Sequence, residues 1–183
     1  MIQKGRIVTL LTSTKQTYAQ ESLTNALLKL LKEKDIRHIT VSELAKEAAV
    51  TRVTFYRNYK RLEDVLQIHV EHLITSWYQE NKLDFEKYND KNNRNDLLLS
   101  SLFGHLIDFS DVYDILHQQG LLVLIIPSLK KILTPQSSEA NFGAYLESFF
   151  LYGMYGWILE WYQRGKQESD SEMEVWLRQL IIR

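Results

Sequence analysis

Helix breakers are scarce in this chain. Its 183 residues include only two prolines, Pro127 and Pro135, and seven glycines. These two residue types disfavour the interior of a helix most strongly, whereas the frequent Leu, Glu, Lys and Gln favour it. A hydrophobic content of 45% is enough for a sizeable buried core. The composition therefore predicts an all-α fold.

Apolar side chains recur every three or four positions in several segments, as they do on the buried side of a helix. The first such segment runs from Lys15 to Lys34, and another runs from Leu62 to Trp77. The polar stretch from Asn81 to Asp96 is expected to be a loop, and Pro127 is expected to end or restart a helix. Residues 1–14 fit no helical pattern, and the sequence leaves open whether they are ordered.

The charge is divided unevenly along the chain. Residues 1–61 hold 12 basic and 5 acidic residues, a net charge of +7, whereas the remainder holds 10 basic and 18 acidic residues, a net charge of −8. A concentrated positive region attracts polyanions such as nucleic acids. The same charge count also fits a solvated surface on which the asymmetry arose by chance. The charge alone therefore does not distinguish this alternative from a nucleic-acid-binding region.

Two short helices joined by a tight turn are predicted between Thr40 and Tyr59. The sequence Thr40-Val41-Ser42-Glu43 is a capping box, in which the threonine hydroxyl and the glutamate each bind a backbone amide of the other residue. Thr51 is a second helix cap, and the small residues before it allow the two helices to cross closely. This arrangement is typical of a helix-turn-helix unit.

The second short helix has two chemically different sides. Phe55 and Tyr59 are four residues apart and define its apolar side. The opposite side and its flanks carry hydroxyl groups, cations and one valine, which match the phosphates and base edges of a major groove. A solvated basic helix over a core is the plainer interpretation. Together with the capped partner helix and the charge division, the pattern favours double-stranded DNA as the partner.

Residues 40–60 resemble the DNA-binding signature of the TetR family of bacterial transcriptional regulators. The run Arg52-Val53-Thr54-Phe55-Tyr56 is similar to a subgroup that includes regulators of the dihydroxyacetone-kinase type. The resemblance covers Lys15 to Trp77. It departs from the family at Ala49, where glycine is common, and at Arg61, where a serine often caps the fourth helix.

The resemblance implies a role for each residue of the motif. Thr40, Tyr56 and Lys60 would hold backbone phosphates. Thr51, Arg52, Val53 and Thr54 would approach the bases, and Arg57 would contact either. The resemblance also implies a three-helix DNA-binding domain over residues 15–61 and a helical ligand-binding and dimerisation domain over residues 62–183.

Two long apolar patterns near the C-terminus are candidates for a homodimer interface. Residues 139–164 are apolar nearly all round, with Gly153 and Gly156 leaving room for another helix, and a last helix is expected after a capping box at Ser171. Packing within one subunit is the alternative, but the resemblance implies that these helices pair across a two-fold axis.

The aromatic residues of the acidic part, residues 62–183, form either a pocket for a small-molecule effector or plain core. The sequence identifies no ligand and no cofactor.

Several classes of function lack support in the sequence. The absence of cysteine excludes disulfides and thiolate chemistry, and no nucleophile motif or glycine-rich phosphate loop is present, so an enzyme is not expected. His69 and His72 are three residues apart, but a core histidine is favoured over a metal site. With no membrane-length apolar run and no secretory signal, a cytoplasmic regulator is expected. A helical adaptor or co-activator that binds DNA weakly or not at all is the alternative.

Overall fold

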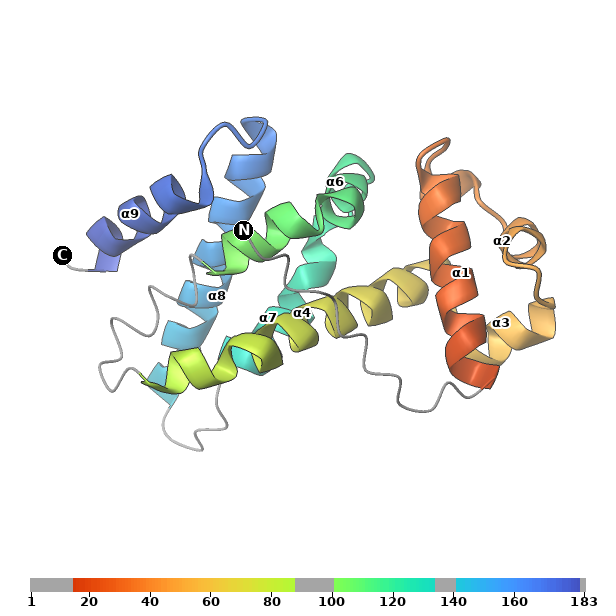
Figure 1. The fold of residues 1–183 in the computed structure, drawn as a ribbon, viewed down its shortest axis with the longest axis horizontal. Coiled ribbons are helices and arrows are strands. Elements are labelled where there is room, and N and C mark those ends of the chain that lie inside the picture. The colour runs from red at the N-terminus through yellow and green to blue at the C-terminus, as the bar shows by residue number, and fades with distance from the viewer. Residues whose placement is uncertain (1–14, 88–100, 134–140, 182–183) are drawn as a thin grey trace, which may run out of the picture. The chain divides into compact units, whose positions relative to one another are not determined.

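The computed structural model describes residues 15–87, 101–133 and 141–181 (Figure 1). Within these ranges every regular element is helical, which confirms the all-α prediction. The chain divides into two compact units, which meet in the sequence between Val65 and Leu66. The elements are α1 (Lys15–Leu31), η1 (Ile36–His38), α2 (Val41–Glu47), α3 (Arg52–Asn58), α4 (Leu62–Lys87), α6 (Ser110–Gln118), η2 (Leu122–Leu124), α7 (Ile125–Leu133), α8 (Asn141–Gln163) and α9 (Asp170–Ile181), and residues 101–108 are also helical.

The first unit is a three-helix core in which α1 contacts both α2 and α3 (Figure 1). The side chains of Leu23, Leu27, Leu44 and Phe55 are fully buried between these helices. The predicted stripe of α1 therefore faces the helix-turn-helix. Burial of large apolar side chains of this kind stabilises a fold by about 1.5–3 kcal/mol each.

The turn between α2 and α3 forms a Schellman motif around Ala49. The Val50 amide donates to the Ala45 carbonyl at 2.9 Å, and the Ala49 amide donates to the Lys46 carbonyl at 3.1 Å. Ala49 has a φ of 52°, in the left-handed region that glycine adopts without strain. The structure therefore has a left-handed turn at Ala49, a residue that tolerates this backbone conformation less well than glycine does.

Asp64, in the first turn of α4, binds the backbone that leads into the helix. Its Oδ2 accepts hydrogen bonds from the amides of both Lys60 and Arg61 at 2.9 Å. Burial alone would raise the pKa of Asp64, but these two amides and the Arg61 guanidinium together lower it. The Asp64 carboxylate thus supplies one half of a capping box, the half in which the third residue of the helix binds the amide of the cap residue and which needs no serine at position 61.

The second unit differs from the sequence prediction at two element boundaries and agrees with it at Pro127, where a helix restarts. The loop expected from Asn81 is wrong as far as Lys87, because α4 continues there and the Asn81 side chain donates to the Trp77 carbonyl within the helix. Pro127 lies in the first turn of α7, where its missing amide hydrogen costs no helical bond. The last helix begins at Asp170, capped by Ser169 and Glu172 instead of a box at Ser171. The rest of the expected loop, residues 88–96, lies outside the described residues.

The core of the second unit lies where α8 contacts α6 and α7. Tyr113, Leu116, Ile125 and Ile158 are fully buried there. No helix in the described ranges is long and apolar enough to cross a membrane.

The turn at Ala49 generates a stability prediction with an internal control. Replacing Ala49 with glycine should stabilise the protein by about 0.5–1 kcal/mol, because it relieves the left-handed backbone at an exposed position. Gly120 occupies the equivalent place after α6, with a φ of 67° and no atom within 4 Å of the point where a Cβ would stand. Gly120→Ala should therefore destabilise the protein, by about 1 kcal/mol.

Urea unfolding followed by circular dichroism measures both changes. The unfolding midpoint should rise for Ala49→Gly and fall for Gly120→Ala. A lower unfolding midpoint for Ala49→Gly would show that the turn is not strained.

Candidate nucleic-acid interface

The orientation of α3 is fixed by its buried side. Phe55 is fully buried and Tyr59 is 4% exposed, with their ring centroids 5.8 Å apart. The predicted cap at Thr51 is confirmed, since its hydroxyl accepts the Thr54 amide at 3.2 Å. Because Phe55 and Tyr59 are buried, α3 is fixed in its rotation about its own axis. The side opposite these two rings therefore faces outward.

The outward side of α3 carries most of the residues predicted to bind DNA. Val53 is 76% exposed and Tyr56 is 62% exposed. Thr51, Arg52 and Arg57 are exposed as well, and Lys60 is exposed in the turn that follows. Six of the eight predicted residues thus belong to α3 or its cap.

Two of the predicted threonines already bind each other. The hydroxyl of Thr54 lies 3.0 Å from that of Thr51, and Thr54 is only partly exposed. Thr51 and Thr54 therefore act as a hydrogen-bonded pair at the first turn of the helix. A hydroxyl in such a pair keeps acceptor capacity for a further contact.

Thr40 lies on a different element, at the start of α2. Its hydroxyl accepts the Glu43 amide at 3.2 Å, which confirms the predicted cap, and the residue is exposed. The Glu43 carboxylate is paired with Lys34 of the segment after α1. Lys34 and, to a smaller extent, the Thr40 amide lower the pKa of Glu43, so this carboxylate holds both the cap and the ion pair.

Ion pairs neutralise three acidic groups of the first unit away from α3. Glu47 pairs with Lys29, Glu43 with Lys34, and Asp35 with Arg37 at 2.7 Å. The segment from 51 to 61 contains four cations and no acidic residue. Within the part of the chain that the structure describes, Arg52, Arg57 and Lys60 form no ion pair, so their charge is available to a polyanion.

Tyr18 is a candidate that the sequence did not identify. It is 66% exposed on α1 and lines a cavity of about 560 Å³ together with Thr51, Thr54 and Arg57. The sequence pattern could have indicated its exposure, because Tyr18 precedes Ala19 and lies off the buried stripe of α1. The structure therefore adds a phenol to the face formed by α3.

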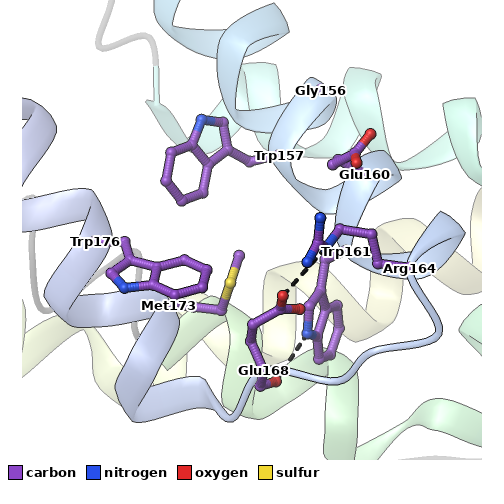
Figure 2. Close-up of a pocket in the computed structure, with 8 residues that line it drawn as sticks. All are labelled: Gly156, Trp157, Glu160, Trp161, Arg164, Glu168, Met173 and Trp176. Carbon is purple, nitrogen blue, oxygen red and sulfur yellow. Dashed lines mark hydrogen bonds and ion pairs between the residues drawn. The ribbon is translucent and has the colours of Figure 1, made fainter.

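A second cavity, of about 370 Å³, lies between α8 and α9 of the second unit (Figure 2). Trp157 and Trp176 face it from the two helices, with Met173 between them. Arg164 closes one side by pairing with Glu168 at 3.2 Å. Trp176 is 44% exposed, so this cavity is open on the surface of α8 and α9.

The described residues contain no group of three or more His, Asp or Glu side chains arranged to hold a metal ion. His69 is half-buried, and burial first, then His72, lowers its pKa while Asp111 opposes the shift. The preference for a core histidine over a metal ligand stays a prediction, since this side chain is only half-buried.

Comparison with known proteins finds similarity in structure alone. No family model and no curated protein matches the chain. Among solved structures, the fatty acid degradation regulator FadR from Bacillus halodurans superposes with a TM-score of 0.61 at 14% identity, covering 87% of this chain and 96% of its own. The transcriptional regulator FadR from Bacillus subtilis, in complex with stearoyl-CoA, gives 0.60 at 16% identity over the same shares.

Lin0861 from Listeria innocua gives a TM-score of 0.66 at 16% identity, covering 94% of this chain and 93% of its own. At such low identity these likenesses establish the fold and not the activity. The chain therefore has the fold of these helical proteins: an N-terminal helix-turn-helix unit followed by a helical unit.

Proposed function

We propose that this chain is a cytoplasmic, TetR-like transcriptional regulator that binds a palindromic DNA site as a homodimer. One observation carries the proposal: α3 is anchored by Phe55 and exposes cations, hydroxyls and a valine on a side without acidic residues. Two of the structural neighbours are described as regulators, which supports the same function. The proposed domains are residues 15–61 for DNA binding and 62–183 for regulation and dimerisation.

The chemistry of the outward side assigns each residue a part in recognition. Arg57 is able to bind guanine through two hydrogen bonds, and Val53 is suited to the methyl group of thymine. Thr51, Arg52 and Thr54 lie close enough to the same end of α3 to approach neighbouring bases. Tyr56, Lys60 and Thr40 are assigned to phosphates, which position the helix without reading sequence.

A homodimer is supported by an apolar surface of α8 that the other described residues leave exposed. Its exposed side chains recur at helical spacing, and Gly153 and Gly156 have open space beside them. A surface of this extent on a single chain is typical of a protein interface. The large apolar residues on it are Phe142, Tyr145, Leu146, Phe149, Phe150 and Tyr152, with Val175 and Trp176 exposed on α9.

A small-molecule effector completes the proposal. The solved FadR from Bacillus subtilis holds stearoyl-CoA, so one protein of this fold binds a small ligand. We place the effector of this chain in its second unit.

The adaptor alternative differs from the proposed function in one respect that is directly measurable: an adaptor would select no DNA sequence.

The cations of α3 and of the turn after it predict a strong dependence of DNA affinity on salt. Lys60→Ala should weaken binding to every duplex alike and reduce the slope of log affinity against log salt by about 0.9, the value for one lost phosphate contact. Fluorescence anisotropy with a labelled duplex of random sequence measures both effects. Lys131→Ala is the control, since this lysine pairs with Glu71 in the second unit. An unchanged slope for Lys60→Ala would remove this lysine from the interface.

Base contacts and phosphate contacts predict different variant behaviour. Arg57→Ala and Thr54→Ala should each lose roughly 1–3 kcal/mol of discrimination at one position of the half-site, whereas Tyr56→Phe should lower affinity for all sequences. Sequencing of duplexes selected from a randomised library measures these preferences. If wild type and Arg57→Ala select identical sequences, α3 does not read bases, and the adaptor alternative gains support.

The surface of α8 predicts the assembly state. Tyr145→Asp combined with Phe149→Asp should convert the dimer to a folded monomer, because both side chains are about three-quarters exposed in the single chain. Leu83→Asp, on a leucine that is 72% exposed on α4, is the matched control and should stay dimeric. Light scattering distinguishes the two states. A monomeric wild-type protein would contradict the proposed interface.

A further inference from the structure

A separate cavity of about 440 Å³ opens in the second unit, between α4, the helical residues 101–108 and the start of α9. Trp77 and His105 line it and are each only 5% exposed, so they form its inner wall. The Trp77 indole donates to the Ser101 hydroxyl at 2.9 Å. The His105 ring lies 4.8 Å from Phe109 and 5.8 Å from Trp77, measured between centroids. The inner wall is thus a fixed aromatic surface.

His105 is a buried polar group with one free position. Its Nε2 is 2.9 Å from the hydroxyl of Tyr113, and within the described residues its Nδ1 has no hydrogen-bond partner. Burial lowers the pKa of His105 to about 4, so the ring is neutral near pH 7. Nδ1 is not one of the fully buried atoms that lack a partner, so it is accessible and is able to exchange a hydrogen bond with water or with an occupant of the cavity.

Carboxylates surround the mouth of this cavity. Glu80, Asp108 and Asp170 line it and are exposed, and among the described residues no lysine or arginine lines it. Asp170 uses Oδ1 to accept the Ser171 amide, while its Oδ2 lies 3.9 Å from where a Cβ on Gly104 would stand. None of the three carboxylates forms an ion pair within the described part of the chain. The mouth therefore has a concentrated negative charge.

We propose that this cavity binds a small organic cation with an aromatic or apolar body. A cation is attracted both by the faces of aromatic rings and by carboxylates, and an apolar body fits the inner wall. An anionic ligand would meet three like charges at the mouth. The proposal rests on the proposed function in one respect, since it names the chemical class of the effector sensed by the second unit.

Two probes of similar size and opposite charge test the ligand class. Benzyltrimethylammonium and benzenesulfonate are titrated into the full-length protein, without DNA, by isothermal calorimetry. The cation should bind at least tenfold more tightly than the anion. Equal binding of the two probes, or binding of benzenesulfonate alone, would overturn the inference.

Matched double variants test the location. Glu80→Gln with Asp108→Asn should weaken benzyltrimethylammonium binding at least tenfold. Glu160→Gln with Asp111→Asn makes the same chemical changes at carboxylates that do not line this cavity, and Glu160 lines the cavity of Figure 2 instead. All four side chains are at least partly exposed, so the variants should keep the wild-type circular dichroism spectrum. Equal losses in both double variants would overturn the assignment to this cavity.

A DNA-binding measurement separates this inference from the proposed function. If the protein selects a DNA sequence but binds no cation, the cavity inference fails and the proposed function stands. If the cation binds at Glu80 and Asp108 and the protein selects no DNA, the cavity inference stands and the proposed function fails.

Discussion

Burial of Phe55 is the constraint on which the candidate interface depends. With this ring fully buried and Tyr59 beside it, α3 has no freedom to rotate about its axis. The orientation of the outward residues therefore follows from packing in the core. A short helix of seven residues would not hold this geometry alone, because isolated helices of that length are unstable in water. The stability of the first unit and the chemistry of its surface are linked through one side chain.

Each of the two units has a surface on which charges of one sign gather. In the first unit three acidic residues are paired with lysines and an arginine of α1 and the segment after it, and the cations of α3 have no ion pair with any residue that the structure describes. In the second unit three carboxylates gather around an aromatic cavity without a lysine or arginine among its described lining residues. A near-neutral chain thus holds two surfaces of opposite sign, one suited to a polyanion and the other to a cation.

Local signals in the sequence predicted local structure well. The caps at Thr40 and Thr51 and the buried side at Phe55 and Tyr59 depend on neighbouring residues, and all are confirmed. The loop expected from Asn81 is wrong as far as Lys87, because a polar residue continues a helix when its side chain binds the turn before it. The cavity at His105 and the place of Tyr18 arise from segments distant in sequence, which periodicity does not bring together. The roles of the eight predicted DNA-binding residues stay predictions.

The proposed function requires the outward side of α3 to lie against DNA bases. A photo-crosslinking amino acid in place of Val53, which is 76% exposed in the first turn of α3, tests it directly. Irradiation with duplex DNA should join the protein to bases from position 53, whereas the same amino acid at position 145 of α8 should give no crosslink. DNA binding without a crosslink from position 53, or equal crosslinks from both positions, would contradict this account.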